Sequence, residues 1–417
     1  REPGQPAGRT EHRRGTPPGV PTRDLHDYTY WVPFLSDHSR AFTGALKSVG
    51  CRTVLLPPTD DDAWQLGLRH AYGRECHPYV SFLGDLLRAS QRPDFVSEEA
   101  CYFGPSYFGP CLLPQFMVAM KLVLDRLGLS AVSLVNIADP PTMRPLGRGY
   151  VTRLALGLYA IDRLFKWKVE SEPYDADGAM ARAYAAAIDA IEDGLARRRF
   201  FPALREAVAR MSAVPVPADA GTRPRIGVIG DTYTRINRHA NDRLYDRLRD
   251  SGFEVWPSCS LVDVSLLGAE QLHQEMIRRG QVVAGTAARA AIPGVAGLRH
   301  LIDRHFPETL RTPQERQYPD VSRVAGTYAS HWIDKALSLN LSRVEELRQA
   351  GATGVINAMC HNCMLGTVTA ALLPAMRRDH DGIATCTLVY EGLQSIHNVN
   401  RLEAFAHQVR QADRSAR

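Results

Sequence analysis

Short apolar runs alternate with amphipathic stretches along the first third of the chain. Four runs have the length and the β-branched or aromatic content of buried strands, at residues 28–35, 52–56, 101–104 and 131–137. Apolar residues recur at helical spacing between them, over 36–49, 80–89 and 115–127. Strands that alternate with helices are typical of a parallel sheet. We therefore expect an α/β domain over residues 24–149.

The pattern changes between residues 150 and 223. Two long stretches rich in Ala, Leu, Arg and Glu, 150–167 and 177–212, carry apolar residues at helical spacing. Helices of this kind more often pack against domains or bridge them than catalyse. Proline-containing residues 214–223 then predict a linker. The interval 150–223 is thus expected to be a helical segment that joins two domains.

A second alternation of strands and helices follows the linker. Its predicted strands cover 225–229, 253–256, 353–357 and 383–390. Its predicted helices cover 240–251, 342–350, 367–379 and 401–410, and residues 263–340 look mainly helical. Residues 224–417 therefore predict a second α/β domain. We expect two doubly wound parallel-sheet domains, Rossmann- or flavodoxin-like, that face a shared cleft.

Composition and charge narrow the class of protein. The 417 residues are 45% hydrophobic and 23% charged, which is typical of a soluble globular protein. Residues 1–23 hold five Arg and two Glu, so +3 of the net charge of +5 belongs to a segment that we expect to be a disordered tail. The rest is near neutral, which argues against a nucleic-acid partner. No apolar run reaches the length of a membrane span, and eight cysteines without a secretory signal predict a reducing, cytoplasmic location.

Four of the eight cysteines lie in turns among Gly, Pro, Asn and His. They are Cys76 in Gly73–Tyr79, Cys111 in Gly109–Cys111, and Cys360 and Cys363 in Asn357–Gly366. Each turn precedes a helical run, and ligands bind at such strand-to-helix turns in α/β sheets. We interpret these three turns as one site. The other four cysteines lie within or beside strands and are expected in the core: Cys51, Cys101, Cys259 and Cys386.

The pair Cys360-x-x-Cys363 fits three kinds of site. A thioredoxin-like redox pair normally follows the first strand of a small domain, whereas this pair follows a late strand. A zinc site needs four ligands, and His361 could supply one, but no second cysteine pair lies nearby in the sequence. An iron–sulfur site takes thiolates from separated loops. The spacing alone leaves all three interpretations open.

Other polar residues are weaker candidates. The run Asp60-Asp61-Asp62 has the composition of a metal site, but a helix N-terminus favoured by the helix dipole is the commoner reason for such a run. Tyr107, Tyr390 and Glu391 are candidates for polar roles near the site, although buried tyrosines usually serve structure.

Eight short motifs, taken in their order, resemble one family. They are Leu55-Leu-Pro-Pro58, Gly73-x-Glu-Cys-x-Pro78, Leu83-Gly-Asp-Leu-Leu87, Gly109-Pro-Cys111, Gly128-Leu129, Gly351-x-x-Gly-Val-Ile-Asn357, Cys363-Met-x-Gly366 and Arg401-Leu-Glu-Ala-Phe405. This combination resembles the 2-hydroxyacyl-CoA dehydratase superfamily, which includes benzoyl-CoA reductase subunits and double-cubane cluster proteins. The likeness is greatest to the C-terminal region of the large CoA-dehydratase activase-related proteins and covers nearly all of residues 28–410.

The resemblance implies an iron–sulfur cluster. In the family, three cysteines of one subunit hold it, and the positions that match are Cys76, Cys111 and Cys363, with Cys360 as an additional thiol. The implied cofactor is a [4Fe-4S] cluster with one iron left open, or alternatively a double-cubane [8Fe-9S] cluster. Three neighbours of the matched cysteines are candidates to tune the cluster from outside its ligand shell: Glu75, His77 and Asn362.

The resemblance also implies a lyase reaction on acyl-CoA. A separate ATP-hydrolysing activator delivers a low-potential electron, the cluster passes it to the thioester carbonyl, and a ketyl radical expels the hydroxyl group. The chain shows no Gly-rich phosphate loop, so the activator is expected to be another protein, and the enzyme a homo- or heterodimer. The family commonly has Arg directly after the second cysteine, where this chain has Leu112. The alternatives are a double-cubane-type reductase of small molecules and a non-catalytic cluster-carrying subunit.

Overall fold

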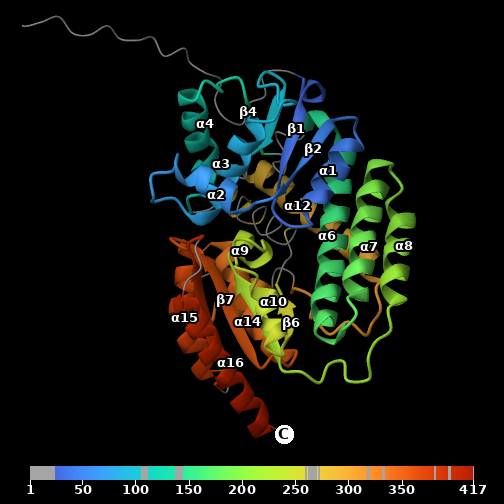
Figure 1. Ribbon diagram of the computed structural model, residues 1–417, viewed down its shortest axis with the longest axis vertical. Coiled ribbons are helices and arrows are strands. Elements are labelled where there is room, and N and C mark those ends of the chain that lie inside the picture. Colours follow the sequence, from blue (N-terminus) through green and yellow to red (C-terminus); the bar gives the residue numbers. More distant parts are fainter. Residues whose placement is uncertain are drawn as a thin grey trace, which may run out of the picture.

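Two four-stranded parallel sheets form the framework of the protein. The computed structural model describes residues 24–104, 111–136, 144–258, 261, 270, 273–316, 320–330, 334–379, 382–392 and 396–416. Within these residues the sheet orders are β2-β1-β3-β4 and β6-β5-β7-β8, and no strand belongs to both sheets. The predicted α/β class with two parallel sheets is therefore confirmed. Figure 1 shows the first sheet above the second.

The first sheet and its helices follow the predicted alternation closely. The strands are β1 (Thr29–Phe34), β2 (Arg52–Pro58), β3 (Ala100–Phe103) and β4 (Ser133–Val135). The helices are η1 (Leu25–Asp27), α1 (Ser39–Lys47), α2 (Asp61–Leu68), α3 (His77–Ser90), η2 (Leu113–Gln115) and α4 (Phe116–Arg126). Asp60 caps α2, because its carboxylate accepts a hydrogen bond from the Ala63 N–H at 2.9 Å. This contact supports the cap interpretation of the aspartate run.

The second sheet extends further than the sequence predicted. Its strands are β5 (Arg225–Gly230), β6 (Glu254–Pro257), β7 (Gly354–Cys360) and β8 (Ala384–Tyr390). Its helices are α9 (Thr232–Ile236), α10 (Leu244–Asp250), α12 (Val282–Asp303), α13 (Asp320–Ala325), α14 (Lys335–Gln349), α15 (Met364–Asp379) and α16 (Ile396–Ala416). Strand β7 was predicted to end at Asn357 but continues to Cys360, since every residue of Gly354–Cys360 is buried and pairs with β8.

The predicted helical segment stands along one edge of the molecule (Figure 1). It consists of η3 (Arg144–Leu146), α6 (Arg148–Ser171), η4 (Glu172–Tyr174), α7 (Ala179–Ala196) and α8 (Phe200–Ser212). The chain turns between α7 and α8 where Arg198 takes a positive φ of 60°. Helix α6 packs against α1 of the first unit and against β6 of the second. It therefore bridges the two sheets, as its amphipathic pattern suggested.

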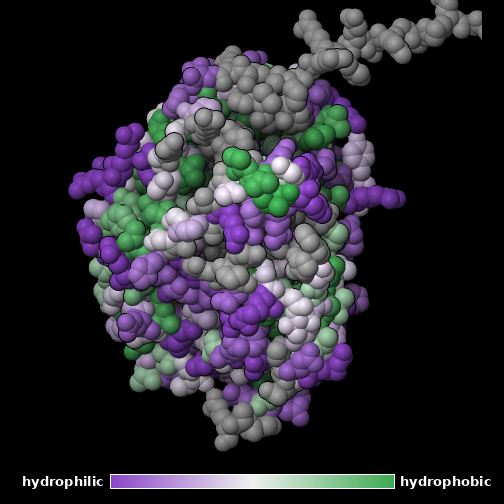
Figure 2. Space-filling model, turned by 180° about the vertical axis from the view of Figure 1, so that it is seen from behind, coloured by the Kyte–Doolittle hydropathy of each residue, from purple (hydrophilic) through white to green (hydrophobic). Residues whose placement is uncertain are grey.

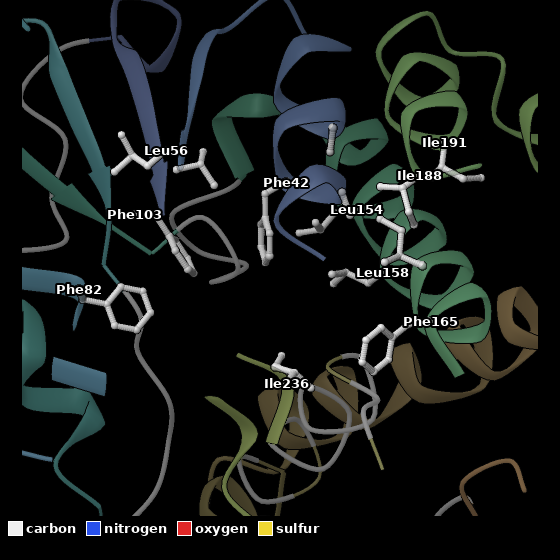
Figure 3. Packing of buried hydrophobic residues seen from close by; sticks show 14 of the residues in the cluster. Phe42, Leu56, Phe82, Phe103, Leu154, Leu158, Phe165, Ile188, Ile191 and Ile236 are labelled. Carbon is white, nitrogen blue, oxygen red and sulfur yellow. The ribbon is translucent and has the colours of Figure 1, made fainter. Parts of the chain in front are cut away.

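The two units share one hydrophobic core. A single cluster of buried side chains runs from Leu56 and Phe103 of the first unit, through Leu158 of α6, to Val228 and Ile236 of the second. Figure 3 shows the aromatic and aliphatic side chains of this cluster where the units and the helical segment meet. A smaller cluster packs α14 and α15 against the second sheet. Burial is thus continuous across the boundary between the units.

A network of buried charges crosses the same boundary. Lys166 of α6 pairs with Asp162 at 3.0 Å and with Glu315, and Arg343 of α14 also pairs with Glu315. Burial alone would raise the pKa of Glu315, but Arg343 and Lys166 hold it well below its usual range. Asp162 in turn lies 3.5 Å from the buried His38 at the start of α1. The network therefore links α6 to both α/β units.

One face of the molecule is mostly polar where its residues are described (Figure 2). Figure 2 shows polar side chains over most of the face seen from behind, with apolar groups in small separate patches. None of the described helices combines the length and the apolar character that a bilayer crossing requires.

Candidate metal centre

Each candidate cysteine lies at the end of a strand or the start of a helix. Cys76 is the N-cap residue of α3. Cys111 lies two residues before η2, which leads directly into α4. Cys360 is the last residue of β7, and Cys363 immediately precedes α15. The thiols thus come from three segments, two in the first unit and one in the second.

The structure brings three of these thiols into contact. The Cys360 thiol faces the sulfurs of Cys363 and Cys76, and its interactions with these thiols, together with burial and the nearby Asp231 carboxylate, hold the pKa of Cys360 well above its usual range. Cys360 is only 3% exposed, whereas Cys76 and Cys363 are half-buried. The side chain of Cys360 therefore points toward the other thiols rather than into the hydrophobic core.

Cys111 lies beside this group. Burial raises the pKa of its thiol, and negative charge on Cys76, Asp334 or Cys363 would raise the pKa further. The backbone N–H of Leu113 hydrogen-bonds to the Cys111 sulfur and opposes this rise. All three cysteines that were predicted to form the site, and the additional Cys360, thus lie in one region between the two units.

Asp231 joins the site and was missed in the sequence. Its carboxylate and the sulfurs of Cys360 and Cys363 lie within 4.8 Å of one another. One oxygen accepts the Cys360 N–H at 2.7 Å, and the other caps α9 through the Thr234 N–H at 2.8 Å. The sequence did hold a signal for Asp231, which is the Gly230-Asp231 pair at the end of a buried strand. Asp231 follows β5 in the same way as Cys363 follows β7.

Strand pairing explains why Asp231 and Cys360 meet. Strands β5 and β7 are parallel neighbours, and Gly230 pairs with Ala358 at their carboxyl ends. A Cβ atom on Gly230 would lie 1.8 Å from the Ala358 carbonyl oxygen, and Gly230 has a φ of +130°. Only glycine fits this close approach of two backbones. The contact holds the turn that carries Asp231 against the end of β7.

Glu75 interacts within its own unit, whereas the ring of His77 also packs against Tyr233 and His239 of the second unit. The Glu75 carboxylate accepts hydrogen bonds from the N–H groups of Tyr72 and Arg74, so it organises the loop before α3. His77 is buried, and its Nδ1 accepts the Trp64 indole N–H at 3.0 Å, which places the imidazole proton on Nε2, facing Ser81. Burial lowers the pKa of His77 to about 3, so the ring is neutral and serves packing beside Cys76.

The third expected tuning residue joins two loops. Asn362 takes a left-handed conformation with a φ of 61°, and its amide donates to the Arg74 carbonyl at 3.4 Å. It thereby links the Cys363 turn to the Cys76 turn. Backbone N–H groups donate to two of the candidate sulfurs, Leu113 to Cys111 and Gly366 to Cys363 at 3.3 Å.

The other predicted cysteines and polar candidates differ in their burial. Cys51 and Cys101 are buried as expected, while Cys386 is only half-buried. Tyr390 is buried, and burial raises its pKa far above the usual value; Glu391 is exposed and lies 3.5 Å from His361. Cys259 and Tyr107 lie outside the described residues.

Comparisons with known proteins add no identification. No family model matches the chain, and no curated protein matches it. The assignment of a function therefore rests on the residues and their geometry.

Proposed function

We propose that this chain is an iron–sulfur protein of the 2-hydroxyacyl-CoA dehydratase type. Its cluster would be held by Cys76, Cys111 and Cys363, with Cys360 as an additional thiol. The observation that carries this proposal is the convergence of these cysteines from three separate segments. Residues that only fill a core have no need to gather four thiols between two sheets, whereas a cluster needs thiolates from separated loops.

The surroundings of the sulfurs suit thiolate ligands. Cys76 and Cys363 directly precede α3 and α15, and Cys111 precedes η2 and α4. A helix N-terminus stabilises negative charge and favours the thiolate form of cysteine. The N–H groups of Gly366 and Leu113 donate to two of the sulfurs, as protein N–H groups do around iron–sulfur clusters. These features support a site for an anionic, thiolate-bound group.

The strand orders support a doubly wound arrangement of both sheets. In both sheets the first strand of the unit lies between the second and the third, so the chain reverses its direction of winding between β1 and β3 and again between β5 and β7. Open α/β sheets bind ligands outside the carboxyl ends of the strands at this reversal. We infer two doubly wound, Rossmann- or flavodoxin-like units whose carboxyl edges face a shared cleft.

The proposed reaction is the dehydration of a 2-hydroxyacyl-CoA. When bound, the cluster supplies a single low-potential electron, which it receives from a separate ATP-hydrolysing activator. The residues of this chain hold the cluster through their thiols and keep water from the site. The continuous core and the buried His77 and Trp64 close one side of the region next to Cys76. We further propose that the enzyme is a homo- or heterodimer located in the cytoplasm.

The test is metal analysis of protein purified without oxygen. The wild-type chain should be brown and contain about four irons and four sulfides, and Cys111→Ser should lose most of the iron. Cys386→Ser, which removes a half-buried thiol on β8, is the matched control and should keep the cluster. A colourless wild-type protein that takes up no iron and sulfide on reconstitution would contradict the proposal. Turnover of acyl-CoA only with an activator would separate an enzyme from a cluster-carrying subunit.

A double-cubane-type reductase is a second candidate. The observation that favours it is the position of Cys360, whose thiol contacts two of the three proposed ligands and could supply a further thiolate. About twice as much iron per chain, with a loss of part of it in Cys360→Ala, would support the larger cluster. An unchanged iron count and an unchanged electron paramagnetic resonance spectrum in this variant would exclude Cys360 as a ligand.

A further inference from the structure

The triangle of Asp231, Cys360 and Cys363 has the size of a site for one metal ion. Its three ligand atoms lie within 4.8 Å of one another. A tetrahedral zinc ion with Zn–S bonds of about 2.3 Å places its ligand sulfurs about 3.8 Å apart, so small movements would close this triangle around an ion. Thiolates that bind different irons of one cubane stand farther apart, because each points away from the centre of the cluster.

The triangle is held by the backbone before any metal binds. The two oxygens of Asp231 accept the N–H groups of Thr234 and Cys360. Cys360 lies within the β7–β8 ladder, paired with Tyr390, and the Cys363 N–H bonds to the Cys360 carbonyl at 3.1 Å. Groups that are oriented in this way lose little freedom on binding a metal, and such supporting contacts raise metal affinity.

The charge of the triangle also calls for a cation. Asp231 makes no ion pair with Lys, Arg or His in the part of the chain that the structure describes, although it is half-buried beside two thiols. A carboxylate in such surroundings is normally compensated by a cation or a metal. Two sulfurs with one carboxylate form a donor set that suits Zn²⁺ and other thiophilic divalent ions.

We propose that Asp231, Cys360 and Cys363 form a mononuclear site for a thiophilic divalent cation of the Zn²⁺ class. The Cys76 thiol, which lies beside Cys360 but outside this triangle, would fill the fourth position after a movement of its side chain. The site shares thiols with the proposed iron–sulfur cluster but needs neither Cys111 nor the assembly of a cluster. One chain therefore holds either a single ion or a cluster, and the two occupancies exclude each other.

Zinc titration of the metal-free full-length chain tests the proposal. The experiment is done without oxygen, with a phosphine reductant and a chromophoric chelator that competes for Zn²⁺. The wild-type chain should bind one Zn²⁺. Asp231→Asn and Cys360→Ser should each weaken binding by at least about 100-fold, because each removes a direct ligand, whereas loss of an outer contact costs about 10- to 100-fold. Co²⁺ bound in place of Zn²⁺ should show thiolate charge-transfer absorption that weakens in Cys360→Ser.

Two variants keep the result separate from the proposed function. Cys111→Ser and Cys386→Ser should bind Zn²⁺ like the wild type, whereas Cys111→Ser should fail to hold the cluster. Zinc affinity that is unchanged in both Asp231→Asn and Cys360→Ser overturns the mononuclear site, and so does an equal loss in Cys111→Ser. Should Asp231→Asn not fold, Cys363→Ser takes its place in this comparison. Reconstitution of the wild type with iron and sulfide is scored independently, so either proposal can fail alone.

Discussion

The two sheets have the same strand order but use their carboxyl edges differently. In the first unit, the end of β1 contacts the second unit, because the Phe34 and Leu35 carbonyls accept hydrogen bonds from the Asn237 side-chain amide. In the second unit, the corresponding edge carries Asp231 and Cys360 at the ends of β5 and β7. The end of β1 thus joins the units, whereas the ends of β5 and β7 offer ligand atoms directly. The first unit contributes its proposed ligands, Cys76 and Cys111, from the segments before α3 and η2.

The largest expected effect comes from the close contact between the ends of β5 and β7 in the second unit. Gly230→Ala would place a Cβ atom 1.8 Å from the Ala358 carbonyl oxygen, so β5 and β7 would have to separate. We expect a loss of more than about 4 kcal/mol in the free energy of unfolding, measured by chemical denaturation. Gly252→Ala and Gly50→Ala, one in each unit, are controls with positive φ and open space around the Cβ position, and should cost about 1 kcal/mol each. Equal losses in all three variants would contradict the proposed clash.

The next effect tests the charge network that joins the units through α6. Lys166→Met leaves Glu315 and Asp162 buried without this partner, and breaking a buried ion pair from one side costs about 3–5 kcal/mol. The control is Lys168→Met on the same helix, whose more exposed pair with Glu172 should contribute about 1 kcal/mol or less. Thermal and chemical unfolding of both variants measure the difference. A loss no larger than that of the control would show that the network contributes little.

A smaller effect tests the direct contact between the units. Asn237→Ala removes the buried amide that donates to Leu35 at 2.9 Å and to Phe34 at 3.3 Å, and leaves both carbonyls without this donor. We expect a loss of about 2 kcal/mol. Asn398→Ala removes a similar pair of backbone contacts, to Val389, within the second unit only. It should cost about 1 kcal/mol, because Asn398 is less buried. If Asn398→Ala lost more stability than Asn237→Ala, the prediction would be wrong, because the contact between the units would then be weaker than the contact within the second unit.

The smallest effect concerns Asp85, a buried carboxyl group of the first unit. Asp231 of the second unit differs from it, because it is half-buried and accepts hydrogen bonds from two backbone N–H groups. Burial raises the pKa of Asp85 to about 7, although the Thr59 hydroxyl donates to it at 2.7 Å. The folded protein thus holds a proton between about pH 4 and pH 7 that the unfolded chain has released, so stability falls as the pH rises through this window. Asp85→Asn should remove this slope, a gain of roughly 1–2 kcal/mol at pH 8 relative to pH 6. Denaturation at both pH values provides the measurement. The same pH dependence in Asp85→Asn and wild type would contradict the raised pKa.

The order of elements could be predicted from the sequence because it depends on local periodicity. The eight strands of the described residues and most of their helices lie where apolar spacing placed them. The sequence also placed Cys76, Cys111 and Cys363 before helices, although Cys76 lies between α2 and α3 rather than in a strand-to-helix turn. What escaped prediction depends on pairing between distant segments. Strand β7 reaches Cys360 because β8 pairs with it to the end, and Asp231 meets the thiols only because β5 is the neighbour of β7. No local pattern encodes which strands become neighbours.

The core shared by both units has a consequence for the order of events during synthesis. Translation produces the first unit, with Cys76 and Cys111, long before β7 and Cys363 leave the ribosome. The apolar faces that later meet the second unit stay uncovered in the meantime, since the buried cluster is continuous across the boundary. The nascent chain therefore needs protection from aggregation until its last strands arrive. A metal ion that binds Cys360 and Cys363 soon after they are synthesised would occupy the site before the two units pack against each other.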